Sequence, residues 1–206
     1  QLLYHFFWDE LCSWYIELQK PVLTGDDEDA KLAGRKVLRH VLDMSLRLLH
    51  PLMPYVTEVL WQELPRAASA PDSIMHARFP TAEDGLRDDD ARARAERLMN
   101  AVTALRTVRS EYNVAPSVPI ALHAVTDDPA FGELLSESSA LLSALARIQT
   151  VQVQGVGDER PAGCATAVIE GAELLVPLKG VIDLSAERER LDREKTKALK
   201  VEAFLN

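Results

Sequence analysis

The spacing of apolar residues changes once along this chain of 206 residues, and that change limits the folds it can adopt. As far as Tyr112, apolar side chains recur every three or four residues, which is typical of helices with one buried face. From Ser117 to Leu178, short runs approach alternation of apolar and polar residues, which is typical of strands. The sequence therefore predicts a mainly α protein with a small α+β part, in which a helical bundle precedes a small α/β appendage.

Prolines delimit the helices predicted in the first half. Pro21 is predicted to end the first helix, because a residue that precedes proline disfavours helical geometry. Pro54 suits the first turn of another helix, where its missing N–H costs nothing, and Pro65 is predicted to end that helix. The inward stripe of this helix is predicted to consist of Val56, Val59, Leu60 and Leu64. The predicted helices span residues 1–20, 30–50, 54–64 and 88–112.

An acidic segment, Thr24–Asp29, precedes the helix predicted over residues 30–50. Carboxylates near a helix start are favoured by the positive end of the helix dipole, so the segment indicates a turn that leads into a helix. A calcium loop is the alternative, although the alternating ligands and central glycine of an EF-hand are missing.

The second half is predicted to contain four strands and one or two short helices. The strands are expected over residues 118–125, 150–154, 164–170 and 173–178, and the helices over 130–146. Three domains follow: a helical bundle over 1–113, a small α/β subdomain over 114–180 and a truncated arm over 181–206. In the arm, Asp183 or Ser185 is predicted to cap a helix with Leu184, Leu191, Ala198 and Leu205 at heptad spacing.

The formal net charge of −9 is unevenly distributed. Residues 114–178 hold 2 basic and 8 acidic side chains, whereas residues 87–113 hold 6 basic and 5 acidic ones. Protein contacts to phosphate are mostly cationic, so a nucleic-acid partner would have to contact the helical parts of the chain rather than its acidic middle.

Composition excludes several classes of protein. Cys12 and Cys164 are far apart and have no Cys or His at ligand spacing, which argues against zinc and fits a reducing cytoplasm. The longest apolar runs are far shorter than the roughly 20 residues that a membrane span needs. The first residue is Gln1 rather than methionine, so we expect a piece of a longer chain.

Motifs for covalent chemistry are missing from the sequence. It contains no Walker loop, no Gly-x-Ser-x-Gly elbow and no His-Glu-x-x-His motif. Gly155 and Gly157 lack the third glycine of a dinucleotide site, since Arg160 occupies its place, so a hairpin turn is predicted there. The five histidines do not cluster along the chain. We therefore predict no catalytic residue and no metal ligand.

Four stretches resemble the C-terminal region of valyl-tRNA synthetases, which are class I aminoacyl-tRNA synthetases. They are Trp8–Pro21 (WDELCSWYIELQKP), Leu49–Gln62 (LHPLMPYVTEVLWQ), Val108–Ser117 (VRSEYNVAPS) and Val176–Asp183 (VPLKGVID). The second stretch is shared by several class I synthetases, whereas the first and third are closer to the valine enzymes. The fourth, with the charged helix after it, resembles the start of their coiled-coil arm. The cysteine-rich zinc element expected of an isoleucine-type enzyme is missing.

The resemblance implies a helical anticodon-binding domain, a small α/β appendage and a coiled coil that reaches toward the tRNA elbow. The implied partners are tRNA, in its valine isoacceptors, and the catalytic domain of the same chain. ATP and Mg²⁺ are implied as cofactors of the full-length ligase, and none is implied for these residues. The adenylation signatures, the editing domain and the first helices of the bundle are expected upstream, so the piece alone is expected to be inactive.

Basic residues on the predicted helix surfaces are the candidates for tRNA contact. Lys36, Arg39 and Arg47 are predicted on the exposed side of the helix over 30–50, where they would contact phosphates. Surface pairs with Asp43, which lies four residues from both arginines, explain the same spacing.

Arg106 and Arg109 complete the candidates. Arg109 is predicted close to the middle of the buried stripe of its helix, where a lone charge is costly. It therefore either pairs with a buried carboxylate of a neighbouring helix or faces a groove and contacts RNA, and Arg106, at the edge of the stripe, shares this ambiguity. Trp8, Trp14 and Trp61 are predicted to pack in the core rather than to stack on bases.

Two alternatives remain open. The chain is the same region of another class I synthetase for a branched amino acid, or it is a helical protein-interaction scaffold with no RNA partner, which its acidity supports. In every case we expect a monomeric, cytoplasmic protein with no membrane segment.

Overall fold

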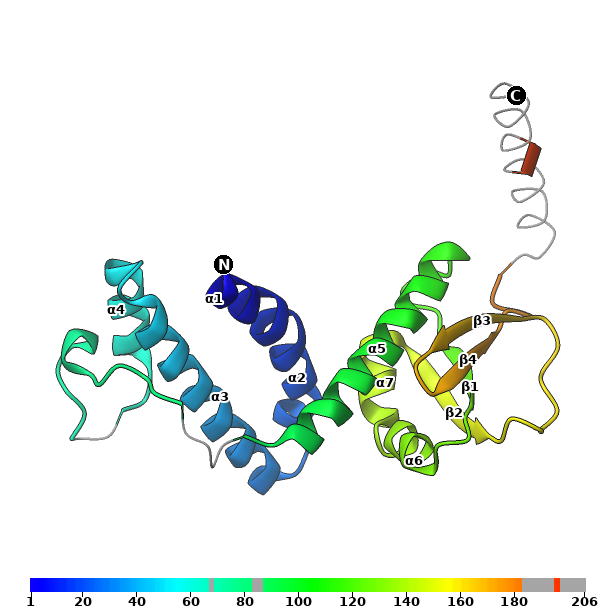
Figure 1. Cartoon of the computed structure of the whole chain (residues 1–206), viewed down its shortest axis with the longest axis horizontal. Helices are drawn as coiled ribbons and strands as arrows, with labels where there is room; N and C mark the ends of the chain where they lie inside the picture. The colour runs from blue at the N-terminus through cyan, green and yellow to red at the C-terminus, as the bar shows by residue number, and fades with distance from the viewer. Residues whose placement is uncertain (67–68, 83–86, 183–194, 197–206) are drawn as a thin grey trace. The chain divides into compact units, whose positions relative to one another are not determined.

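The computed structural model describes residues 1–66, 69–82, 87–182 and 195–196, and the chain forms two compact units, Gln1–Asp88 and Asp89–Asn206 (Figure 1). The described part is mainly helical and includes one four-stranded sheet, which confirms the predicted fold class. The predicted boundary at 113/114 differs from the boundary between these units. The helix that begins at Asp89 belongs with the sheet because it packs against two of the strands and against the two short helices.

The elements that the structure describes in the first unit are all helical. Its elements are α1 (Leu2–His5), a π-type helix η1 (Phe6–Tyr15), α2 (Ile16–Thr24), α3 (Glu28–Leu49), α4 (Pro54–Glu63) and a 3₁₀ turn η2 (Ile74–His76). The prediction that Pro21 ends the first helix is wrong, because α2 continues to Thr24. Pro21 removes only its own N–H from the helical hydrogen bonds, and the helix ends one turn later, where Thr24 Oγ1 donates to the Lys20 carbonyl at 2.8 Å.

The acidic segment before α3 leads into this helix, as predicted, and it also caps the helix. The Asp27 carboxylate accepts a hydrogen bond from the backbone N–H of Ala30 at 3.0 Å, and Glu28 and Asp29 lie in the first turn. Helix α4 begins at Pro54, also as predicted.

The inward face of α4 differs from the predicted stripe. Thr57 and Trp61 are its buried residues, whereas Val59 is 63% exposed. Trp61 forms a small core with Leu46 and Ile74, and of the predicted stripe Leu64 packs against this core.

An apolar groove of about 860 Å³ lies beside this core within the first unit. Residues of α1 and η1 line one part of it and residues of α3, α4 and their connection line another; among them are Leu2, Tyr4, Trp8, Leu49, Met53, Val56 and Leu60. The predicted stripe residues Val56 and Leu60 therefore face this groove rather than the core.

The second unit combines one long helix with a small α/β fold. Its elements are α5 (Asp89–Glu111), β1 (Ile120–Val125), α6 (Pro129–Glu137), α7 (Ser139–Ala146), β2 (Ile148–Gln154), β3 (Cys164–Ile169) and β4 (Ala172–Pro177). The sheet has the order β2-β1-β4-β3, in which β1 and β2 are parallel and the other pairs are antiparallel. Helices α6 and α7 form the crossover that the parallel pair requires. All four strands were predicted from alternation.

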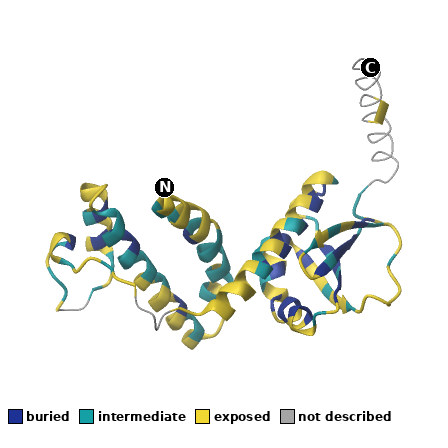
Figure 2. Cartoon of the chain, in the orientation of Figure 1, coloured by how far each residue is buried: buried dark blue, intermediate teal, exposed yellow. Residues whose placement is uncertain are grey.

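The core of this unit lies between α5, the two short helices and the sheet. Leu98, Val102 and Leu105 are buried on α5, as predicted, and Leu122 and Leu174 are fully buried in the sheet. Figure 2 shows buried positions on α5 and on the sheet. Gly171 adopts φ +81° in the turn between β3 and β4, a conformation that favours glycine. Residues 155–158 form a turn, but it does not close the predicted hairpin, because β2 and β3 are not paired.

The predicted arm helix over 183–206 lies outside the described residues apart from a short helical piece at 195–196. None of the helices in the described ranges combines the length and apolar character that a bilayer crossing requires.

Candidate nucleic-acid interface

Helix α3 carries the first three candidate residues. Lys36 and Arg39 are exposed, as predicted, and Arg47 is partly buried. Among the described residues, Lys36 has no acidic partner, so its ammonium group is available to solvent or to a phosphate.

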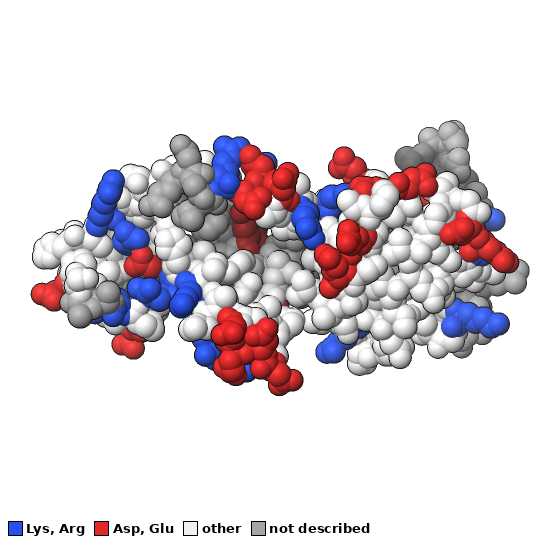
Figure 3. Space-filling model, turned by 90° about the horizontal axis from the view of Figure 1, so that it is seen from below, with Lys and Arg blue, Asp and Glu red and all other residues white. Residues whose placement is uncertain are grey.

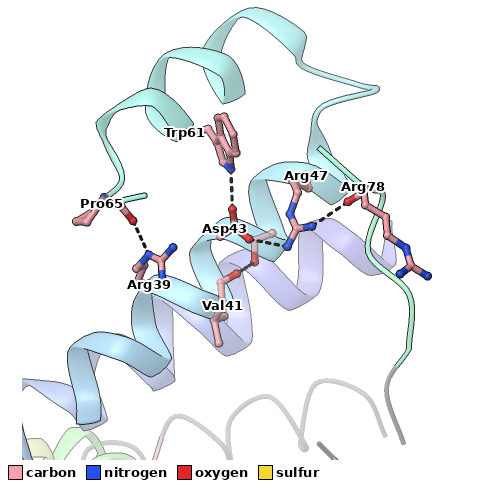
Figure 4. Close-up of polar contacts among 8 residues, drawn as sticks. Arg39, Val41, Asp43, Arg47, Trp61, Pro65 and Arg78 are labelled. Atoms are coloured by element: carbon pink, nitrogen blue, oxygen red, sulfur yellow. Dashed lines mark hydrogen bonds and ion pairs between the residues drawn. The ribbon is translucent and has the colours of Figure 1, made fainter. Parts of the chain in front are cut away.

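Arg39 is held by a neutral acceptor of a distant segment. Its Nε donates to the Pro65 carbonyl at 2.5 Å, just beyond the end of α4 (Figure 4). The predicted pair with Asp43 is therefore wrong for Arg39. Among the described residues its two terminal nitrogens have no acceptor, so the guanidinium is oriented through one nitrogen and leaves the other two for a ligand.

Asp43 joins α3 to α4 and to Arg47. One carboxylate oxygen accepts from the Trp61 indole N–H at 2.6 Å, and the other accepts from Arg47 Nη2 at 2.6 Å (Figure 4). The pair of Asp43 with Arg47 confirms the second predicted surface pair. Arg47 Nη1 also donates to the Arg78 carbonyl at 2.8 Å, so this guanidinium ties α3 to the segment around Arg78 and has little capacity left for a phosphate.

Two further basic residues were missed by sequence reasoning. The Arg66 guanidinium stacks on the Trp61 ring, 4.5 Å from its centroid, and donates to Gln62 Oε1 at 2.6 Å. The Arg78 side chain is exposed, and its backbone carbonyl is the one that accepts from Arg47. Both residues follow helices, where no periodic pattern marks an exposed face, so the sequence offered no signal for them.

The tryptophans divide between core and surface. Trp61 is only 3% exposed, which confirms the predicted core packing. Trp8 is 58% exposed on the rim of the apolar groove, so the same prediction is wrong for Trp8. Its helix has aromatic residues on too wide an arc for all of them to face one neighbour.

Arg106 and Arg109 lie on α5, in the second unit, and both contact the end of α7. Arg109 is 7% exposed and donates from Nη1 to the Ala146 carbonyl at 3.3 Å and from Nη2 to the carbonyls of Ala115 and Val118. The predicted buried carboxylate partner is wrong, because neutral carbonyls take its place. Arg106 is exposed, and its Nε donates to the Leu145 carbonyl at 3.0 Å.

Two titratable groups outside the candidate residues, Glu58 and Cys164, have pKa values shifted by their local contacts or burial. Hydrogen bonds from Gln62, Ser73 and the Ile74 N–H, together with His50 nearby, lower the pKa of the Glu58 carboxyl. Burial raises the pKa of the Cys164 thiol, which makes it a poorer nucleophile. In the described ranges, no three His, Cys, Asp or Glu side chains are grouped so that they could hold a metal ion.

The basic side chains on the surface are arranged for separate contacts with phosphates rather than as one continuous positive surface. On the face in Figure 3, basic side chains form several groups with uncharged surface and acidic clusters between them. Such an arrangement can bind a polyanion at a few phosphates, which position a nucleic acid without reading its bases.

Comparison with known proteins bears on the same region. The sequence matches the family model for the anticodon-binding domain of tRNA ligase over residues 1–125. This match includes the first unit and, in the second unit, α5 and β1.

Individual relatives match over nearly the full chain. Valine–tRNA ligase of Geobacillus stearothermophilus is 41% identical over 192 residues, which are 93% of this chain and 21% of that protein. Valine–tRNA ligase of Syntrophotalea carbinolica is 42% identical over 199 residues, 97% of this chain and 22% of that protein. The chain therefore spans about a fifth of the length of the curated relatives it matches.

Proposed function

Because the chain belongs to the family of anticodon-binding domains of tRNA ligases, we propose that it docks tRNA for a larger ligase. The observation that carries the proposal is the family match over residues 1–125, which contains the basic helix α3. Relatives named valine–tRNA ligase support valine isoacceptors as the tRNA partner and ATP-dependent aminoacylation as the activity of the whole protein. The catalytic domain of the same chain would bind ATP and Mg²⁺.

Lys36 and Arg39 are the residues best placed to hold phosphates. Both are exposed on one helix, and the Pro65 carbonyl already orients the Arg39 guanidinium, which reduces the conformational entropy lost on binding. An arginine fork offers a phosphate two parallel N–H donors. Arg47 has a different role in this proposal, since Asp43 and the Arg78 carbonyl occupy its terminal nitrogens. It supports the shape of the surface rather than contacting RNA.

The salt dependence of tRNA binding tests the proposal. Affinity of the 206-residue chain for valine tRNA is measured by gel shift across a series of salt concentrations. Each phosphate contact contributes about −0.7 to −0.9 to the slope of log K against log salt, because each contact releases condensed counterions. The chain should bind saturably at low salt. The slope should correspond to at least about two phosphate contacts, that is, about −1.4 to −1.8 or steeper.

A matched pair of variants locates the contacts. Lys36→Gln with Arg39→Gln should weaken binding about 10-fold or more and reduce the slope by about 1.4 to 1.8. Lys20→Gln with Arg92→Gln removes the same charges from exposed sites that already pair with acids, and it should leave the slope unchanged. Equal losses in both double variants would reject α3 as the phosphate-binding helix. The absence of saturable binding by the unaltered chain would reject the function itself.

We also propose that the full-length ligase works as a monomer in the cytoplasm and that residues 181–206 begin its coiled-coil arm. The two distant cysteines are consistent with a reducing compartment. Light scattering of the full-length ligase after size-exclusion chromatography tests whether it is a monomer, and the mass of a dimer would contradict the proposal.

A further inference from the structure

A cavity in the second unit is lined by three arginines. It has a volume of about 420 Å³ and lies between the end of α5, the segment after it and the end of α7. Arg106, Arg109 and Arg147 contribute to its walls. The remaining lining residues are Ser110, Val114, Pro116, Ala144, Leu145 and Ala146.

Among the residues that the structure describes, no carboxylate neutralises the charge of Arg109. Its hydrogen-bond acceptors among the described residues are three backbone carbonyls, which are neutral. Within residues 87–182, no ion pair joins Arg109 or Arg147 to an acidic side chain. Burial, and after it the nearby charge of Arg147, lower the pKa of the Arg109 guanidinium, so the two cations are close enough to repel each other.

Arg147 occupies a position that favours glycine. It is the C-cap of α7, with φ 55° and ψ 40° in the left-handed region, where a Cβ atom is strained. Its side chain is exposed, whereas the other basic residue of the acidic segment 114–178, Arg160, pairs with Glu173. Arginine at this position therefore lowers the stability of the fold in two ways, through backbone strain and through repulsion from the buried Arg109.

The carbonyl end of α7 explains part of this arrangement. Basic side chains stabilise the C-terminus of a helix, which carries roughly half a negative charge, and Arg106 and Arg109 donate to its last carbonyls. Half a charge does not balance the two guanidinium groups of Arg109 and Arg147. Arg147 adds a third cation to an end that is already capped by two.

We propose that this cavity binds a phosphate group, held by the three arginines that line it. Arg147 supplies an exposed fork at the mouth, Arg109 a fixed positive charge in the wall and Arg106 a further cation on the rim. Tetrahedral phosphate oxygens match planar arginine forks. The phosphate belongs either to an RNA backbone, in which case the site rests on the proposed function, or to a small phosphate compound.

Thermal unfolding of the 206-residue chain in inorganic phosphate tests the site without RNA. Melting is followed by circular dichroism in phosphate and in chloride at equal ionic strength and pH. Phosphate stabilises most proteins through exclusion from their surface, so the informative quantity is the difference between variants. Near saturating phosphate, the melting temperature of the unaltered chain should rise by about 3 °C or more beyond the rise seen for Arg147→Gln.

Two further variants separate the site from folding. Arg147→Gly removes the same charge but relieves the left-handed strain, so it should melt no lower than the unaltered chain in chloride and still lose the specific phosphate response. Arg92→Gln removes an exposed arginine of α5 far from the cavity and should keep the full response. Equal phosphate responses in the unaltered chain and both Arg147 variants would overturn the proposal.

A tRNA titration identifies the source of the phosphate. If Arg147→Gly also weakens tRNA binding and inorganic phosphate competes with tRNA, the site takes an RNA phosphate. If tRNA binding is unaffected while the phosphate response is lost, the site takes a small phosphate compound. Because the melting experiment contains no RNA, failure of the tRNA proposal alone leaves its result intact.

Discussion

Arg109 holds a positive charge in the protein interior through neutral partners. Its guanidinium joins α5 to two other segments, because its acceptors are the last carbonyl of α7 and two carbonyls of the segment that follows α5. Carbonyl oxygens satisfy the donors without adding a second buried charge. The same bonds satisfy carbonyls that a helix end and a loop would otherwise leave unpaired.

Replacing this side chain should therefore cost stability. Arg109→Met keeps most of the apolar stem but leaves buried carbonyls unpaired, so we expect a loss of about 2–4 kcal/mol in the free energy of unfolding. The matched change Arg92→Met, at a side chain that is 68% exposed, should change it by less than about 0.5 kcal/mol. Urea denaturation measures both, and equal effects would show that the carbonyl bonds contribute nothing net.

Two helical glycines mark close approaches between elements. An added Cβ on Gly34 would lie 2.7 Å from Gln19 Oε1, where α3 meets α2. On Gly132 it would lie 2.8 Å from Val153 Cγ1, where α6 meets β2. The obstacle is the flexible end of a long side chain in the first case and a methyl group of a stiff β-branched residue in the second.

The same substitution should therefore have opposite effects at these sites. Gly34→Ala gains helix propensity, and Gln19 Oε1 can move without losing a bond, because it has no hydrogen-bond partner among the described residues. We expect stabilisation of up to about 1 kcal/mol. Gly132→Ala should destabilise by about 1–2 kcal/mol, because Val153 must leave its position. Thermal melts of the two variants test this, and destabilisation of both by the same amount would contradict it.

The start of α6 couples this helix to α5 through one carboxylate. Asp128 accepts from the N–H groups of Ala130 and Phe131, and Arg97 Nη2 donates to it at 2.7 Å. The Arg97 hydrogen bond, followed by those backbone bonds, lowers the pKa of the Asp128 carboxyl from its ordinary value of 3.8. A lowered folded pKa stabilises the protein above the unfolded pKa, and this contribution is lost as pH falls through the folded value.

Asp128→Asn isolates the charge, because asparagine still caps the helix. The unaltered chain should melt higher than this variant at neutral pH, and the difference should shrink below about pH 4. Melting temperatures from pH 7 to 2.5 measure it. A difference that stays constant with pH would mean that the carboxylate charge is not involved.

In our proposal the whole chain docks tRNA, and the chemistry of the full ligase lies outside these 206 residues. Its family match is to an anticodon-binding domain, and it spans about a fifth of its valine–tRNA ligase relatives. Substrate activation needs an ATP site, which we place in the rest of the proposed ligase chain.

A pyrophosphate-exchange assay tests this placement. The 206 residues alone should give no valine-dependent exchange above background at any tRNA concentration. A full-length relative assayed beside it serves as the positive control. Valine-dependent exchange by the piece would show that the adenylation site lies within these residues.

The order and extent of most elements followed from local pattern. Asp27 and Pro54 mark helix starts because capping and the missing proline N–H act within one turn. Alternation located all four strands, since facing sides of a sheet repeat every two residues. Family resemblance, read from a few motifs, predicted the anticodon-binding family that the comparison confirmed.

The hydrogen bonds between residues far apart in the sequence could not be predicted from the sequence. Trp61 faces inward on α4, in place of Val59, because its indole N–H finds the Asp43 carboxylate on another helix. Arg109 bonds to a carbonyl of α7 that no sequence spacing relates to it. Periodicity specifies that a helix has a buried face, but which side chains fill it depends on the shape and hydrogen-bonding groups of the neighbour. Those neighbours meet only when the chain has folded.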